Sequence, residues 1–98
     1  MMVVKTTEVF DKWFIGLKDR MAKARIQARI DRVEMGNFGD VSSVGEGVSE
    51  LRIFYGPRYR VYFVKQNSVV VILLSGGDKS SQQTDIAKAK EITKQLEI

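Results

Sequence analysis

"LRIFYGPRYRVYF", residues 51–63, decides the fold, because two strand-like segments flank a Gly–Pro turn signal. Aromatic and β-branched residues on both sides of the turn favour strands at about residues 48–55 and 59–65. The same stretch holds three arginines, Arg52, Arg58 and Arg60, among its aromatic side chains. The first question is therefore which face of this predicted hairpin is buried and which carries the positive charge.

The register of the hairpin follows from the alternation of side chains along a strand. A two-residue loop would mix apolar and basic side chains on each face, whereas a three-residue loop over residues 56–58 separates them. The predicted pairs are Leu51–Phe63, Ile53–Val61 and Tyr55–Tyr59 on one face, and Arg52–Tyr62 and Phe54–Arg60 on the other. We therefore expect one face to form the core and the other to be cationic and aromatic.

Two more strands are expected beside this hairpin. The polar sequence "KQNS", residues 65–68, is typical of a turn into a strand over residues 68–75. Six successive apolar residues, 69–74, predict that this strand is buried on both faces and lies inside the sheet. Residues 2–6 predict a short first strand, and the glycine-containing segment 36–49 reads as a connection without much structure of its own.

Helical spacing of apolar residues predicts three helices. The first covers about residues 7–18, the second about residues 19–35, and Ser80 with Gln83 has the spacing of a capping box before the last. The expected buried stripes are Val9, Phe10, Trp13, Phe14 and Leu17; Ala22, Ile26, Ile30 and Val33; and Ile86, Ala89, Ile92 and Leu96. We predict an α+β fold in a single domain, residues 1–98: an N-terminal helical hairpin packed on a small, mainly antiparallel β-sheet, with a C-terminal helix.

Composition narrows the chemistry. Hydrophobic residues make up 44% and charged residues 29% of the chain, the balance of an ordinary folded domain, and neither a signal peptide nor a membrane span is evident, so we expect a cytoplasmic protein that binds no membrane. With no cysteine and no histidine, a zinc site and acid–base work by imidazole are both disfavoured, and we expect no metal or other cofactor. The net charge of +4 favours an anionic partner.

Four cations are expected to converge at one end of the sheet. Extending the predicted register places Ser75 beside Arg58, so that Gly76 and Gly77 bring Lys79 toward Arg58 and Arg60. The predicted site contains Arg52, Arg58, Arg60 and Lys79, with Tyr62 and Tyr59 beside them. Arginine donates to phosphate oxygens and tyrosine stacks on unpaired bases, which indicates single-stranded nucleic acid. The same pattern also fits an exposed strand face whose arginine stems cover aromatic rings.

A second group of basic residues lies along the predicted second helix. Arg25, Arg29 and Arg32 recur at helical spacing on its outer face. This stripe fits either an ordinary solvated helix face or a patch for nucleic acid or an acidic protein partner.

Three segments together resemble a known family. They are "AKARIQARIDRVEMGNFGD" (22–40), "VGEGVSELRIFYGPRYRVYF" (44–63) and "LLSGGDKSSQQTDIAKAKEI" (73–92). In order and spacing the chain resembles the RelE/ParE superfamily of type II toxin–antitoxin toxins, in particular the HigB-like branch known as addiction module killer proteins. This resemblance covers nearly the whole chain and implies a RelE-like fold.

The resemblance implies a growth-inhibiting endoribonuclease, an mRNA interferase that cuts messenger RNA on the ribosome. In that reaction a ribose 2′-OH attacks the adjacent phosphate, without a metal. By position, Arg60 matches the phosphate-contacting arginine of the family, Lys79 a second cation, and Arg52 a basic position in the preceding strand. Phe54 stands where RelE has a further lysine, so the identity of the general base is left open. Arginine is a poor base because it stays protonated. An amine surrounded by other cations, such as that of Lys79, is a better one.

Further expectations follow from the same resemblance. RelE has a base-stacking tyrosine early in its last helix, where this chain has Thr84, Asp85 and Ile86. Stacking would then fall to Tyr62, Tyr59 or ribosomal RNA. The resemblance thus implies Arg60, Lys79, Arg52 and Tyr62 as the catalytic residues. The expected partner is a helix-turn-helix antitoxin that forms a hetero-oligomer with the toxin and covers either the basic sheet face or the arginine stripe. Two alternatives remain: a ParE-like toxin that inhibits DNA gyrase without cutting RNA, and a degenerate chain that only binds antitoxin.

Overall fold

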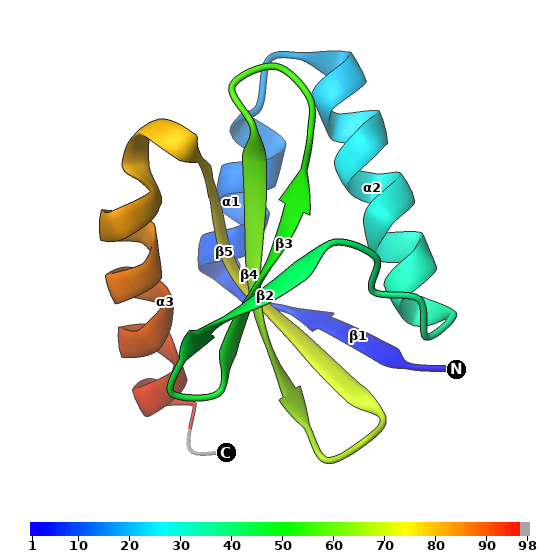
Figure 1. The fold of residues 1–98 in the computed structure, drawn as a ribbon, viewed down its shortest axis with the longest axis vertical. Helices are drawn as coiled ribbons and strands as arrows, with labels where there is room; N and C mark the ends of the chain where they lie inside the picture. The colour runs from blue at the N-terminus through cyan, green and yellow to red at the C-terminus, as the bar shows by residue number, and fades with distance from the viewer. Residues whose placement is uncertain (97–98) are drawn as a thin grey trace.

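The computed structural model describes residues 1–96 and has the predicted α+β architecture (Figure 1). Two helices follow a short first strand, a run of antiparallel strands comes next, and a helix closes the chain. In chain order the elements are β1 (Val3–Thr6), α1 (Glu8–Gly16), α2 (Arg20–Glu34), β2 (Val41–Gly45), β3 (Val48–Ile53), β4 (Tyr59–Gln66), β5 (Val70–Asp78), the 3₁₀ turn η1 (Lys79–Ser81) and α3 (Gln82–Gln95).

The five strands form one sheet in the order β1-β5-β4-β3-β2. β1 is parallel to β5, with Val3 opposite Val70, and the other neighbours are antiparallel. β5 therefore lies inside the sheet, between β1 and β4, and its residues 71–75 are buried. The prediction of an internal strand buried on both faces is confirmed.

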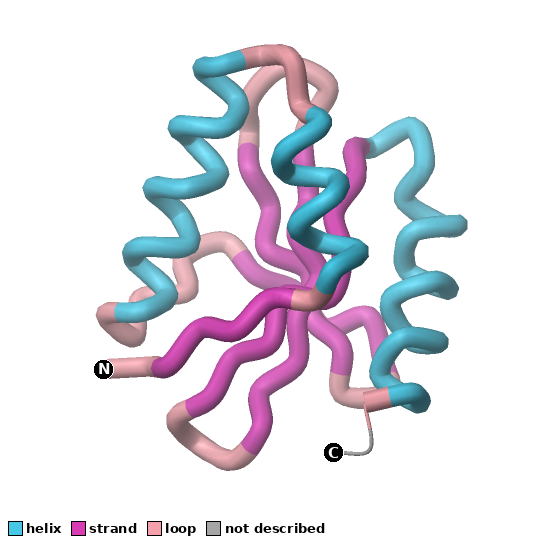
Figure 2. Tube along the Cα trace, turned by 180° about the vertical axis from the view of Figure 1, so that it is seen from behind, coloured by secondary structure: helices cyan, strands magenta, loops and turns pink. Residues whose placement is uncertain are grey.

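Helices cover both faces of the sheet. The α1 and α2 side holds one apolar cluster and the α3 side another. Figure 2 shows α1 in front of the middle of the sheet, with α2 to its left and α3 to its right. The first cluster includes Phe10, Ile26, Ile30, Val33, Leu51, Ile53, Val61 and Phe63, and the second includes Val48, Tyr62, Val64, Ile72, Leu74 and Ala89. The predicted helix stripes accordingly face the sheet.

Side-chain caps fix where the first two helices begin. The hydroxyl of Thr7 accepts a hydrogen bond from the Phe10 amide at 3.1 Å, and the Asp19 carboxylate accepts from the Met21 and Ala22 amides at 2.9 and 3.2 Å. These bonds satisfy amides that have no partner inside the helix. Because only a few residues separate the two helices, they form the predicted hairpin.

The segment over residues 36–49 is more ordered than predicted. Within it, β2 pairs antiparallel with β3, with Val41 opposite Leu51 and an irregularity between Ser43 and Gly45. A turn with positive φ at Glu46 and Gly47 then reverses the chain. The sequence prediction was wrong here, because an edge strand held by backbone pairing needs few large side chains, and its serines and glycines read as a loop.

The central hairpin has the predicted faces but not the predicted pairs. Ile53 lies opposite Tyr59 and Arg52 opposite Arg60, so the loop has five residues, 54–58. The register differs by two positions, which leaves every side chain on its predicted face. The longer loop is held by its own hydrogen bonds, from the Tyr55 amide to the Ile53 carbonyl and from the Arg58 amide to the Tyr55 carbonyl, both 3.0 Å.

The approach to α3 also differs from the sequence prediction. The Asp78 carboxylate, not a Ser80–Gln83 capping box, begins this segment by accepting from the Ser80 amide at 2.8 Å. Gly76 and Gly77 are needed immediately before it, because a Cβ at Gly76 would lie 2.3 Å from the Trp13 ring and one at Gly77 would lie 1.8 Å from the Asp85 carboxylate. The two glycines let α1 and α3 approach the end of β5 closely.

Candidate functional site

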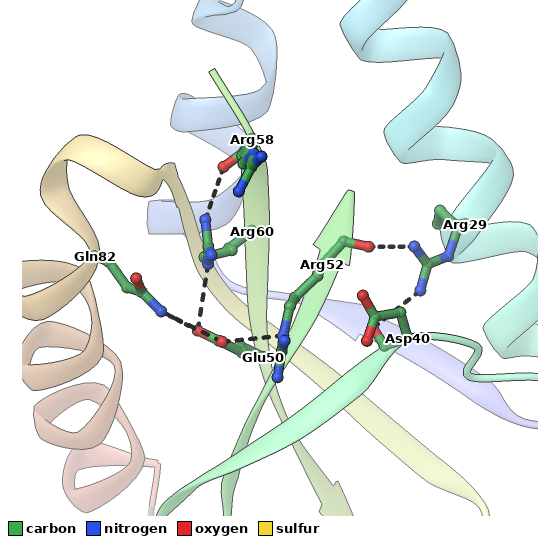
Figure 3. A network of polar contacts seen from close by, with 7 residues as sticks. All are labelled: Arg29, Asp40, Glu50, Arg52, Arg58, Arg60 and Gln82. Atoms are coloured by element: carbon green, nitrogen blue, oxygen red, sulfur yellow. Dashed lines mark hydrogen bonds and ion pairs between the residues drawn. The ribbon is translucent and has the colours of Figure 1, made fainter. Parts of the chain in front are cut away.

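A buried carboxylate lies at the centre of the polar network between β3, β4 and α3 (Figure 3). Glu50, on β3, is only 4% exposed. Its oxygens lie 3.3 Å from Nε of Arg52 and 3.6 Å from Nε of Arg60. The amide of Gln82 donates a hydrogen bond of 3.1 Å to the same carboxylate. Strand alternation puts Glu50 and Arg52 on one face, and the register brings Arg60 across from Arg52.

Two guanidinium groups therefore share one carboxylate, which leaves an excess positive charge. Neither Arg52 Nε nor Arg60 Nε makes a hydrogen bond within the described part of the chain, so their contacts with Glu50 are ion pairs without aligned hydrogen bonds. Such an arrangement is costly to bury unless further partners satisfy it. The pair thus carries an excess positive charge, and the exposed part of the Arg52 guanidinium can receive an anion.

The two arginines differ in access. The Arg52 side chain is 34% exposed, whereas that of Arg60 is 10% exposed and its Nη1 donates to the Arg58 carbonyl at 3.0 Å. Arg52 is therefore the one that an incoming anion reaches first. The less exposed Arg60 contacts both Glu50 and the Arg58 carbonyl, and so connects Glu50 to the loop that follows β3.

The fold brings two exposed cations, Arg58 and Lys79, to the same end of the sheet, by a register other than the predicted one. Ser75 lies opposite Tyr62 and not beside Arg58, and Tyr59 lies opposite Asp78. Arg58 occupies the loop in a left-handed conformation with φ 64°, and the Lys79 amide donates to the Pro57 carbonyl at 3.2 Å. Lys79 is consequently next to the loop that carries Arg58.

Neither tyrosine predicted to stack on a base presents a free ring. Tyr62 has no exposed surface, and its hydroxyl has no hydrogen-bond partner among the described residues. Burial, with the nearby Glu50 carboxylate, raises the pKa of Tyr62 above the usual tyrosine range, so its phenol stays neutral. The ring of Tyr59 packs against Trp13, with centroids 6.2 Å apart. The expectation of an open aromatic face is wrong because α3 covers this part of the sheet.

The arginine stripe of α2 divides into three environments. Arg29 turns inward and donates to the carbonyls of Arg52, Phe38 (3.0 Å) and Asp40 (3.2 Å). Burial lowers the pKa of Arg29 from its ordinary value. The Arg25 guanidinium lies over the Tyr55 ring, 4.8 Å from its centroid, whereas Arg32 is exposed near the end of α2. A uniform outward stripe does not form.

Glu50 and Gln82 were not identified from the sequence. Glu50 is a charged residue two positions before Arg52 in a strand whose neighbours are apolar, and that spacing alone places the two side chains together. Gln82 carries no comparable signal, because its role depends on where α3 begins. Among residues 1–96 no group of three or more His, Cys, Asp or Glu side chains is arranged to hold a metal ion.

The protein is therefore a small α+β protein whose sheet carries two arginines, Arg52 and Arg60, paired with one buried carboxylate, Glu50. The chain belongs to the family described as phage-derived protein Gp49-like (DUF891), whose model matches residues 12–97. It is 55% identical over 93 residues to an uncharacterized protein of Haemophilus influenzae (strain Rd), covering 95% of this chain and 94% of that protein. None of the described helices has the length and apolar character needed to cross a membrane.

Proposed function

We propose that this protein is the toxin of a type II toxin–antitoxin module and that it inhibits translation by cutting messenger RNA on the ribosome. The observation that carries the proposal is the cluster in which Arg52 and Arg60 flank buried Glu50, with exposed Arg58 and Lys79 at the same end of the sheet. Membership of the Gp49-like family and the RelE/ParE resemblance of the sequence also support this proposal.

The proposed reaction is transesterification by the RNA itself. The ribose 2′-OH attacks the adjacent phosphorus, the bond to the 5′-oxygen of the next nucleotide breaks, and a 2′,3′-cyclic phosphate and a 5′-hydroxyl remain. Positive groups around the phosphate stabilise the charge that accumulates in the transition state. A base must take the proton of the 2′-OH, and a proton must reach the leaving oxygen. This chemistry needs neither a metal nor a cofactor.

Each side chain has a distinct proposed role. Arg52 contacts the phosphate, because it combines partial exposure with an ion pair that fixes its orientation. Glu50 positions the two guanidinium groups, and Arg60 completes that brace and contributes charge from behind. Exposed Lys79 is the amine at this end of the sheet that can exchange a proton with the reacting oxygens.

A helix-turn-helix antitoxin that forms a hetero-oligomer with this chain is part of the proposal. Its acidic side chains would cover the end of the sheet that carries Arg52, Arg58 and Lys79, where charge complementarity is greatest. The outward residues of the α2 stripe, Arg25 and Arg32, are a less suited surface, because Arg25 already lies against Tyr55.

The test is primer extension on cellular messenger RNA after brief induction of the wild type, Arg52→Ala, Lys79→Ala and the control Arg32→Ala, each without antitoxin. We expect new 5′ ends inside translated regions with the wild type and the control. Removing one charge-stabilising donor at a reacting centre typically costs about 100- to 1,000-fold in rate, so both site variants should lose these ends.

Arg60→Ala is a less decisive variant than the other two, because it also removes a brace from a buried carboxylate and so perturbs folding. Growth arrest by the wild type without new 5′ ends would contradict RNA cleavage and direct attention to a protein target such as gyrase.

A further inference from the structure

Phe54 is an exposed aromatic residue two positions after Arg52 in the chain. It is 66% exposed and lies directly after Ile53, the last residue of β3. Neither apolar cluster of the sheet includes it. A single exposed apolar residue is ordinary on a protein surface. Phe54 is of interest because of its neighbours and because the other aromatic rings are already packed.

The neighbouring residues indicate the side of the sheet on which Phe54 lies. Ile53 is buried in the cluster under α1 and α2, and the Tyr55 hydroxyl donates to Asp19 at the start of α2, at 3.0 Å. The hydrogen bond from the Tyr55 amide to the Ile53 carbonyl closes a tight turn over Phe54. With both neighbours directed to the helical hairpin, alternation places Phe54 on the opposite side, the side of Arg52.

The other aromatic rings have partners. Tyr62 is fully buried, Tyr59 meets Trp13, and Arg25 covers Tyr55. Phe38 stacks on Phe63 with centroids 5.5 Å apart. Among residues 1–96, Phe54 is thus the aromatic side chain whose ring is mainly exposed to solvent.

Three cations lie near Phe54 in the chain or beside its loop. Arg52 precedes it by two positions on the same strand side, and Arg58 shares its loop. The Lys79 amide is bound to the Pro57 carbonyl, which places a third cation next to that loop. An exposed aromatic face among arginines and lysines matches single-stranded nucleic acid, whose bases stack on rings while its phosphates contact cations.

We propose that Phe54 stacks on an unpaired base of the messenger RNA next to the phosphate contacted by Arg52. This inference rests on the proposed RNA-cleaving function and assigns the base contact to the β3–β4 loop instead of to either predicted tyrosine. Because every base has a π face, the contact holds the RNA in position without selecting a particular base.

The test compares Phe54→Leu, which keeps an apolar side chain, with Phe54→Trp, which keeps a stacking ring. Val69→Ala is a matched control, since Val69 is also exposed, at 48%, but lies in the turn between β4 and β5. Single-turnover cleavage is measured on ribosomes carrying a defined messenger RNA. A second readout uses the same message with 2′-O-methyl groups, which cannot be cut, and 2-aminopurine in the target codon, whose fluorescence reports stacking.

We expect Phe54→Leu to lower the cleavage rate about 5- to 150-fold, the range that loss of one base–aromatic stack implies. It should also remove the protein-dependent change in 2-aminopurine fluorescence. Phe54→Trp and Val69→Ala should stay within about threefold of the wild type. Thermal unfolding should be similar for all variants, because the Phe54 ring belongs to neither apolar cluster.

Two results would overturn the inference while leaving the proposed function intact. In the first, Phe54→Leu cleaves and changes the fluorescence as the wild type does. In the second, Phe54→Trp is as defective as Phe54→Leu although both are folded. If instead the wild type cuts no RNA and Arg52→Ala behaves identically to it, the proposed function fails and the stacking role fails with it.

Discussion

Two arginine centres lie side by side in this protein and use their charge differently (Figure 3). Arg29 of α2 donates three hydrogen bonds to backbone carbonyls of other segments, so its chief effect is to hold those segments together. Arg52 and Arg60 share one carboxylate, and the Arg52 side chain is 34% exposed. The comparison indicates that exposure, together with the type of acceptor, separates an arginine that holds the fold from one, Arg52, that can receive a ligand.

The largest expected effect is that of removing the shared carboxylate. Glu50→Ala leaves two guanidinium groups facing each other in a largely buried position, and breaking a buried ion pair costs about 3–5 kcal/mol of unfolding free energy. Urea unfolding measures this loss. Glu91→Ala is the control, because the Glu91 side chain on α3 is 65% exposed and its pair with Lys94 contributes little. Equal stability of the two variants would mean that Glu50 does not hold the centre.

A smaller loss is expected at the carbonyl-bound centre. Arg29→Ala takes a donor from three carbonyls, but that of Asp40 still accepts from the Arg52 amide at 3.0 Å and the other two are only partly buried. We therefore expect a total loss of about 1–3 kcal/mol of unfolding free energy. Arg32→Ala, one turn further along α2 and exposed, should change stability by less than about 0.5 kcal/mol. Denaturant unfolding of the two variants tests whether Arg29 is a brace. If both are equally stable, the distinction between the two centres fails.

The smallest expected effect concerns Tyr62, which lies beside Glu50 yet has an unpaired hydroxyl. Tyr62→Phe should stay within about 1 kcal/mol of the wild type near neutral pH, and be stabilising if it differs, because it removes a buried polar group without a partner. RNA cleavage should be unchanged. A large loss of cleavage with unchanged stability would restore the catalytic role predicted for Tyr62 from the sequence.

The same variant has a pH signature. The folded protein keeps the Tyr62 phenol protonated because burial raises its pKa, whereas the unfolded chain loses that proton near pH 10. Above about pH 10 the unfolded state therefore binds fewer protons than the folded state, and stability falls as the pH rises. Unfolding free energies at pH 8 and pH 11 should decline less for Tyr62→Phe than for the wild type. Tyr59, whose pKa burial also raises, supplies part of the remaining decline.

Helix faces and strand faces were readable from the sequence because they follow fixed periods of 3.6 and 2 residues. Ala22, Ile26, Ile30 and Val33 are buried as that period requires. Exact strand pairing was not readable, since a shift of two positions leaves every face unchanged. The observed register is supported by the hydrogen bond from the Tyr55 hydroxyl to Asp19, a contact between a loop and a distant helix.

The candidate site was only partly readable for a related reason. Local spacing placed Arg52 and Arg60 on one face, and the order of the chain placed Lys79 near the hairpin loop. No local pattern states which face of the sheet a closing helix covers, so the burial of Tyr62 under α3 could not be foreseen. Glu50 was overlooked because a lone acid in a strand looks unfavourable until the two arginines that surround it are known.

The bond from Arg29 to the carbonyl of Arg52 joins residues 23 positions apart in the chain. Backbone position at Arg52 thus depends on a helix that has no part in the proposed chemistry. If the chain is a toxin as proposed, a genetic selection for cells that survive its expression should yield substitutions at Arg29 as well as in the proposed site. A map of inactivating mutations would extend across α2, and lowering the growth temperature should return Arg29 variants, but not Arg52 variants, to the toxic phenotype.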